Sequence, residues 1–216
     1  MLSFLLNIFS GKKRKSRLQL LAEKIGFTLS SDWDYSLDHA LQDFTYSGMN
    51  RTRPASYNVL SASLDGVRWK IFDHNGSRPG GFWRIFRFQT MIYVEWTGAV
   101  AANLSNLGHY FITPHTRFAG FHMLFKKKPA GEAYQVQDTP SGPFLIMAEN
   151  KTALTGVPQG LLEALGRNKK KRYSIEVLRN SAVFYRKDKV VPPKDIPDLF
   201  DDALHFVDLF KGKTAV

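Results

Sequence analysis

Apolar and polar residues alternate most regularly over residues 58–74 (NVLSASLDGVRWKIFDH), and this pattern predicts a β-hairpin. Asp65 and Gly66 at its centre are a favoured pair for a two-residue type I′ turn, in which both residues need a positive φ. That turn fixes the register, so Asn58 opposes Asp73 at the open end, where we expect a cross-strand hydrogen bond. One face of the hairpin then carries the apolar residues Leu60, Ala62, Leu64, Val67, Trp69 and Ile71.

Further alternating segments extend this hairpin into a sheet. Residues 82–96 predict a long strand that pairs antiparallel with residues 67–74. A second hairpin is predicted over 172–178 and 181–186, with Arg179 and Asn180 in its turn. Shorter strands are expected at 27–29, 110–113, 121–125, 133–137 and 144–148.

Helical spacing of apolar residues appears before and after these strands. Residues 17–25 predict a helix that stops at Gly26, and a second helix is expected to begin at a cap on Ser31 or Asp32. Residues 152–165 predict a helix that is broken around Pro158.

The closing helix is predicted over residues 195–210 and should pack on the sheet. The sequence therefore predicts an α+β fold: an antiparallel sheet of about six or more strands, N-terminal helices, and a C-terminal helix packed on the sheet. The stripe that this helix should bury consists of Ile196, Leu199, Phe200, Ala203, Leu204, Val207 and Phe210.

Residues 1–17 differ from the rest, because an apolar run over 1–9 is followed at once by the basic run 12–17. A spanning helix needs about 20 apolar residues, so this segment is too short to cross a bilayer. The order of the two runs favours an interfacial anchor on an anionic membrane surface. The alternative is a helix folded onto the protein's own core. The residues that we expect to bind the membrane are Phe4, Leu5, Ile8, Phe9, Lys12, Lys13, Arg14 and Lys15.

Composition supports a folded, basic protein. Of its 216 residues, 44% are apolar, which is enough for a core, and we expect one α+β domain over 18–211 with a soft subdivision near 140–150. The net charge of +11 favours a polyanionic partner, either a membrane or a nucleic acid. The chain has no cysteine, which excludes disulfides and thiolate metal sites and fits a cytoplasmic location.

Two internal basic runs offer an alternative function. If runs 126–128 and 167–172 share one face, the protein could bind nucleic acid there. If they do not, they are ordinary solvated loops. The residues of this weaker polyanion site are Lys126, Lys127, Lys128, Lys169, Lys170, Lys171 and Arg172.

Catalytic motifs are missing from the sequence, so we predict no catalytic residue, no cofactor and no metal site. The histidines lack the close spacing of metal ligands, and no nucleophile elbow is present. Asp73 and His74 are neighbours on a strand and therefore point to opposite faces, so they cannot form a dyad. An enzyme would need a site assembled from distant residues such as Asp73, His115 and His122, which is the second alternative.

Several short motifs occur along the chain's strands and helix ends: Ala22 with Gly26-Phe27, Asn58-Val59-Leu60 with Phe72-Asp73, Ile175-Glu176-Val177 with Val183-Phe184-Tyr185-Arg186, and Pro192-Pro193. In these motifs the sequence resembles a group of uncharacterised bacterial proteins with a membrane-proximal N-terminus. The resemblance covers most of the chain and implies no known activity, but members of this group often look membrane-tethered. It therefore agrees with our leading hypothesis, a non-enzymatic binding or scaffold module held at the inner face of the cell membrane.

Overall fold

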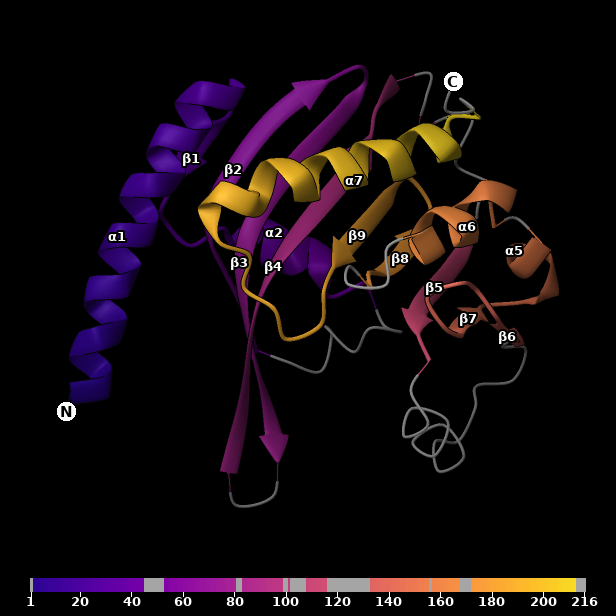
Figure 1. Ribbon diagram of the computed structural model, residues 1–216, viewed down its shortest axis with the longest axis horizontal. Coiled ribbons are helices and arrows are strands. Elements are labelled where there is room, and N and C mark those ends of the chain that lie inside the picture. The colour runs from indigo at the N-terminus through magenta and orange to yellow at the C-terminus, as the bar shows by residue number, and fades with distance from the viewer. Residues whose placement is uncertain are drawn as a thin grey trace.

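Over the residues that the structure describes, nine antiparallel strands form one sheet in the order β1-β2-β3-β4-β9-β8-β5-β7-β6 (Figure 1). The predicted α+β fold is confirmed, with helices at the N-terminal end and a C-terminal helix on the sheet. The structure is a computed structural model. It describes residues 2–44, 53–80, 83–98, 101, 108–115, 133–155, 157–167 and 172–212, with the backbone alone in 2–10, 53–54, 76–80, 83–87 and 159.

The bounds of the elements follow the chain. The strands are β1 (Thr28–Ser30), β2 (Arg53–Leu64), β3 (Val67–Gly80), β4 (Trp83–Trp96), β5 (His109–Pro114), β6 (Ala133–Gln137), β7 (Phe144–Ala148), β8 (Ser174–Leu178) and β9 (Ser181–Tyr185). The helices are α1 (Leu2–Ile25), α2 (Tyr35–Leu41), α5 (Lys151–Thr155), α6 (Gln159–Arg167), the short 3-10 helix η2 (Pro193–Asp195) and α7 (Ile196–Phe210).

The central hairpin has the predicted turn and register. Asp65 and Gly66 have φ values of 50° and 74°, as a type I′ turn requires, and Ala62 pairs with Trp69. The register prediction is wrong at the open end, because a bulge follows Tyr57 and this residue, not Asn58, pairs with Asp73. Asn58 has a φ of 55°, a left-handed conformation that asparagine tolerates better than most residues.

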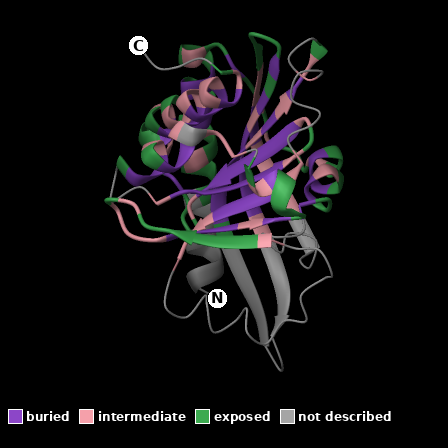
Figure 2. Ribbon diagram, turned by 90° about the vertical axis from the view of Figure 1, so that its right-hand side faces the viewer, coloured by how far each residue is buried: buried purple, intermediate pink, exposed green. Residues whose placement is uncertain are grey.

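Helix α7 covers one face of the sheet, as Figure 1 shows. The Phe200 ring meets Trp69 edge to face with centroids 4.9 Å apart, and Phe210 meets Trp96 at 5.7 Å. The predicted packing of the closing helix on the sheet is therefore confirmed, and the apolar face of the hairpin is the one that it covers. Figure 2 shows that buried residues concentrate in the strands at the centre of the fold.

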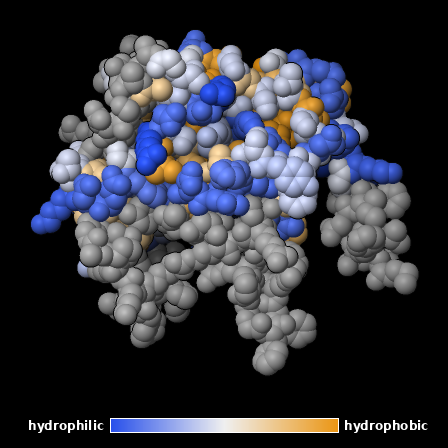
Figure 3. All heavy atoms as spheres, turned by 180° about the vertical axis from the view of Figure 1, so that it is seen from behind, coloured by the Kyte–Doolittle hydropathy of each residue, from blue (hydrophilic) through white to orange (hydrophobic). Residues whose placement is uncertain are grey.

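The other face of the sheet carries a second apolar cluster beneath α2. Leu37, Leu41 and Phe44 pack there against Phe72 and other strand residues. Viewed from this side, behind Figure 1, hydrophilic residues make up much of the described surface (Figure 3). The sheet is thus the middle layer between α7 and α2.

Two helix boundaries differ from the prediction. Helix α1 is continuous from Leu2 to Ile25, so the apolar and basic runs belong to the same helix as residues 17–25. Asp34 caps α2 in place of Ser31 or Asp32, since its Oδ1 accepts a hydrogen bond from the Leu37 amide at 2.9 Å. The predicted break between α5 and α6 is confirmed, whereas the predicted strand 121–125 lies outside the described residues.

The buried stripe of α7 also contains a residue that the prediction left out. Phe206 is 4% exposed and lies against two aromatic rings, stacked on Phe184 and edge to face with Tyr173, with both centroids at 5.8 Å. Phe206 lies three residues after Ala203, so it belongs to the inward side of the same helix.

Replacing Phe206 with alanine should lower the free energy of unfolding by about 3–5 kcal/mol, because it leaves a cavity between α7 and the sheet. Urea unfolding followed by circular dichroism measures this loss. Asp201→Ala is the matched control on the exposed side of the same helix, and it should change stability by less than about 0.5 kcal/mol. Equal effects of the two substitutions would contradict the packing described here.

Candidate functional site

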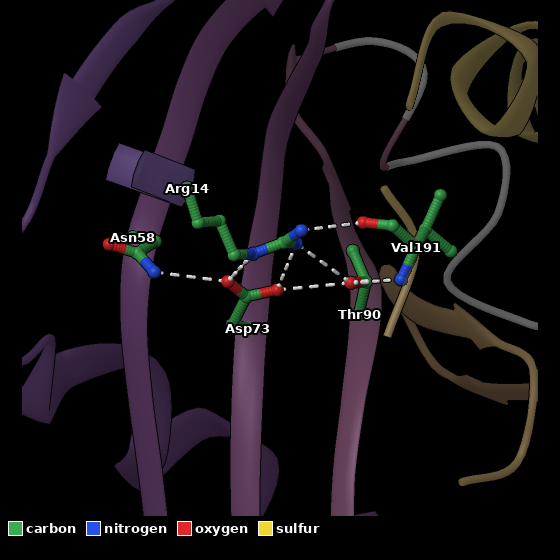
Figure 4. Close-up of polar contacts among 5 residues, drawn as sticks. All are labelled: Arg14, Asn58, Asp73, Thr90 and Val191. Carbon is green, nitrogen blue, oxygen red and sulfur yellow. Dashed lines mark hydrogen bonds and ion pairs between the residues drawn. The ribbon is translucent and has the colours of Figure 1, made fainter. Parts of the chain in front are cut away.

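A bidentate ion pair joins α1 to the centre of the sheet (Figure 4). Arg14 donates from Nε to Asp73 Oδ2 and from Nη2 to Asp73 Oδ1, both at 2.6 Å. The two side chains are 17% and 5% exposed, so the pair is largely shielded from water. Such planar, two-point contact with a carboxylate is specific to arginine, and its electrostatic strength rises as water is excluded.

The remaining acceptor positions of Asp73 are filled by neighbouring strands. Asn58 Nδ2 donates to Oδ2 and Thr90 Oγ1 donates to Oδ1, each at 3.0 Å. The expected hydrogen bond between Asn58 and Asp73 is therefore confirmed. The two side chains form it although Asn58 lies in the bulge and is not the backbone partner of Asp73. A carboxylate with these four donors has its hydrogen-bonding capacity used within the protein.

The network continues from Thr90 to the segment after β9. The Val191 amide donates to Thr90 Oγ1 at 2.9 Å, and Arg14 Nη1 donates to the Val191 carbonyl at 2.8 Å. Figure 4 shows Arg14 lying across the three strands that carry Asn58, Asp73 and Thr90. One side chain of α1 is therefore bonded to β3, β4 and the chain that leads to α7.

The ion pair orients the middle of α1. Leu18, Leu21 and Ala22 are buried on the same side of the helix as Arg14. Lys12, Lys13, Lys15 and Arg17 lie on the exposed side, although the Lys15 ammonium also donates to Ser31 Oγ at 2.8 Å.

Of the predicted membrane residues, Lys12, Lys13 and Lys15 thus face solvent, whereas Arg14 turns inward to the sheet. The apolar residues Phe4, Leu5, Ile8 and Phe9 belong to the first turns of α1, where the backbone alone is described.

The predicted polyanion site falls almost entirely outside the described residues. Lys126, Lys127, Lys128, Lys169, Lys170 and Lys171 all lie there. Arg172 is described, and it binds the protein itself: Nη2 donates to the Pro143 carbonyl at 3.0 Å, and the guanidinium lies 5.6 Å from the centre of the Phe144 ring.

The residues suggested for a dispersed catalytic site do not meet in the described structure. Asp73 on β3 and His115 after β5 are separated by strands β4, β9 and β8, which corresponds to roughly 20 Å across a sheet. His122 lies outside the described residues. The described ranges also contain no group of three or more metal-ligating side chains.

A buried histidine occupies the opposite face of the sheet from Asp73, as predicted for neighbours on a strand. His74 is 3% exposed, and its Nδ1 lies 3.4 Å from the Ser56 hydroxyl. Burial lowers the pKa of His74 to about 4, against a smaller raising effect from the Asp38 carboxylate. The imidazole is therefore neutral in the folded protein near pH 7.

The pKa of His74 in the folded state lies below its ordinary value of 6.5, so unfolding takes up a proton between these two pH values. The contribution of His74 to the free energy of unfolding should be complete above about pH 6.5. It should be lost by roughly 1 kcal/mol per pH unit as the pH drops towards 4. Urea unfolding between pH 4.5 and pH 7 measures the slope. His74→Gln should make the free energy of unfolding less dependent on pH. The control His39→Gln, at an exposed position, should leave the slope unchanged. An unchanged slope in His74→Gln would show that His74 does not cause the pH dependence.

Arg14→Gln should lower the free energy of unfolding by about 3 kcal/mol, because it leaves the Asp73 carboxylate buried without its cation. Adding Asp73→Asn should recover part of the loss, giving a coupling energy of about 1–3 kcal/mol in a double-mutant cycle. Lys13→Gln on the exposed side is the control and should cost less than about 0.5 kcal/mol. If Arg14→Gln is as stable as Lys13→Gln, the ion pair does not hold α1.

Comparison with known proteins shows the fold alone. No family model matches the sequence, and no curated protein is significantly similar to it. Among solved structures, the chain is similar to the crystal structure of the mycobacterial trehalose monomycolate transport factor A, TtfA, with a TM-score of 0.58 and 14% sequence identity. The match covers 94% of this chain and 97% of that chain.

Within the described residues, no helix is both long enough and apolar enough to span a membrane.

Proposed function

We propose that this protein is a non-enzymatic binding or scaffold module that associates peripherally with the inner face of the cell membrane through α1. The proposal is supported mainly by the order of apolar and basic residues along α1 and by the way this helix is fixed to the sheet. Its apolar beginning and basic middle form one continuous element, and Arg14 fixes that element to the sheet while neighbouring basic residues face solvent.

A helical form suits the apolar run for entry into the headgroup boundary. Within a helix most backbone amides and carbonyls bond to one another, and the free amides of the first turn can bond to water or phosphate at the level of the headgroups, so the apolar side chains can leave water. Residues 2–9 extend over about 12 Å, at 1.5 Å per residue, which reaches the boundary region but does not cross a bilayer.

The basic residues supply the second of two signals. One apolar segment alone gives weak and reversible binding, whereas a nearby polybasic patch adds about 1 kcal/mol for each charge at an anionic surface. Lys12, Lys13 and Arg17 are exposed and lie within the next turns of α1. The two signals together favour stable attachment with the folded domain on the cytoplasmic side.

A binding role is favoured over catalysis by the state of the polar cluster at Asp73. Its carboxylate is saturated by Arg14, Asn58 and Thr90, so it has no free oxygen for a substrate or metal. The fold is shared with a protein named for trehalose monomycolate transport, and that likeness is compatible with work at a lipid surface.

Full-length protein should float with vesicles of equimolar phosphatidylglycerol and phosphatidylcholine and should not float with pure phosphatidylcholine. Replacing Phe4, Leu5, Ile8 and Phe9 with glutamine should abolish flotation, because glutamine keeps the helix and removes the apolar contact. The substitutions stop before Arg14 so that the carboxylate of Asp73 keeps its partner.

A charge-matched pair of variants tests the basic signal. Replacing Lys12, Lys13 and Arg17 with glutamine should weaken vesicle binding by about tenfold to a hundredfold. Added salt should weaken vesicle binding of the wild-type protein. The control replaces Lys24, in the last turn of α1, together with the exposed Lys151 and Arg167, and should bind like wild type. Wild-type protein that ignores anionic vesicles at low salt would refute the proposed function.

A further inference from the structure

Two aromatic side chains lie exposed where the chain leaves β1 and enters α2, on the face of the sheet opposite α7 (Figure 1). The rings of Trp33 and Tyr35 are stacked, with centroids 5.0 Å apart and an interplanar angle of 12°. Trp33 is 50% exposed and Tyr35 is 72% exposed, and neither belongs to the apolar clusters of the core. Tryptophan and tyrosine are enriched at protein interfaces, so this aromatic pair favours a contact surface.

The segment around the aromatic pair is acidic, although the protein as a whole is strongly basic. Residues 25–50 contain four aspartates and neither lysine nor arginine, in a chain whose net charge is +11. Lys70 neutralises one of these aspartates, because its Nζ lies 2.6 Å from Asp34 Oδ2. The other three, Asp32, Asp38 and Asp43, form no ion pair with a described residue. This surface therefore attracts a cationic ligand.

Asp38 holds an unpartnered carboxylate oxygen against the aromatic pair. Its Oδ2 accepts a hydrogen bond from Trp33 Nε1, so the carboxylate lies at the edge of the indole ring. Asp38 is only 6% exposed, and its Oδ1 has no hydrogen-bond partner among the described residues. A buried acceptor without a donor lowers stability, and a positively charged donor from a ligand would remove that cost.

An arginine or lysine side chain fits these features together. Cations are attracted to the faces of tryptophan and tyrosine rings, and the planar guanidinium of arginine also stacks on them. The carboxylates beside the rings can accept charge-assisted hydrogen bonds from further cations. An anionic lipid surface or a nucleic acid fits less well, because its phosphates would meet aspartates of the same sign.

The aromatic pair also lies near the helix through which we propose membrane association. Lys15 of α1 donates to Ser31 Oγ at 2.8 Å, and Ser31 lies just before Trp33 in the chain. Cytoplasmic segments close to membrane-spanning helices carry an excess of lysine and arginine. A protein held at the inner face of the membrane through α1 therefore brings this acidic surface close to such segments.

We propose that the aromatic pair, together with the carboxylates of Asp32, Asp38 and Asp43, is a docking surface for an arginine- and lysine-rich cytoplasmic segment of a membrane protein. An arginine of that segment stacks on the aromatic pair, and its other cations pair with the carboxylates. The membrane origin of the segment rests on the proposed function, whereas its positive charge follows from the residues of the surface. The docking surface gives the scaffold role a partner of defined chemistry.

A short basic peptide tests the docking surface. The probe is a fluorescein-labelled peptide that alternates arginine and serine, and fluorescence anisotropy measures its binding to the full-length protein at low ionic strength. The peptide should bind saturably, and added salt should weaken its binding. The same peptide with glutamate in place of arginine should not bind.

Substitution of the aromatic pair tests where the peptide binds. Trp33→Ala with Tyr35→Ala should weaken binding by about tenfold or more, because it removes the stacking surface. Phe88→Ala is the matched control, since Phe88 is 46% exposed on β4, and it should bind like wild type. Circular dichroism checks that each variant is folded.

Substitution of the carboxylates gives a second measurement that leaves both rings in place. Asp32→Asn with Asp43→Asn, at exposed positions, should weaken peptide binding by about tenfold. Glu163→Gln with Asp201→Asn is the charge-matched control, because these residues are exposed on helices that pack on the other face of the sheet. This control should bind the peptide like wild type.

The outcomes separate this inference from the proposed function. If the wild-type protein does not bind the peptide, or binds it no better than both surface variants do, the docking surface is wrong and vesicle flotation still decides the membrane role. If the protein does not float but peptide binding depends on Trp33, the cationic docking surface stands, whereas the proposed function and the membrane origin of the segment are wrong.

A label beside the aromatic pair distinguishes other occupants. The chain has no cysteine, so Ser36→Cys, at an exposed position, can be labelled uniquely with the environment-sensitive dye NBD. The basic peptide should change its emission. A response to anionic vesicles but not to the peptide would mean that this surface faces lipid. A wild-type dimer in analytical ultracentrifugation that Trp33→Ala with Tyr35→Ala abolishes would mean that a second copy fills the surface. Either result overturns the inference.

Discussion

The arrangement of this protein depends on the ion pair between Arg14 and Asp73. A carboxylate that is 5% exposed needs a cation, and the cation comes from a helix 59 residues away in the chain. Its bonds extend through Thr90 and Val191 to the segment that leads into α7. The ion pair thus joins the N-terminal helix, the long central strands and the segment before the C-terminal helix at one place.

Local rules predicted most of the fold. The Asp65-Gly66 turn, the facial sorting of the hairpin, the second hairpin and the stripe of α7 follow from turn chemistry and hydrophobic spacing, which are properties of short segments. The order of strands in the sheet does not follow from these rules. It depends on long connections, and the placement of β8 and β9 between β4 and β5 has no local signal.

The site was predictable only in part. The hydrogen bond between Asn58 and Asp73 was predicted, because these polar residues end two strands whose shared face is otherwise apolar, and the structure contains it. The partnership of Arg14 was missed, because it lies in a basic run whose members look alike in sequence. A signal was present: Asp73 falls on the same face as Trp69 and Ile71, and a carboxylate on a buried face requires a positive partner.

Attachment of α1 to the sheet gives the apolar turns of α1 a fixed position relative to the end of β3 at Gly80. Double electron–electron resonance between spin labels at Ser10→Cys and Gly80→Cys measures that relation in the full-length protein on anionic vesicles. A single narrow distance distribution that broadens when Arg14→Gln is added is the predicted result. A broad distribution with Arg14 present, or a narrow one that Arg14→Gln leaves unchanged, would contradict the account.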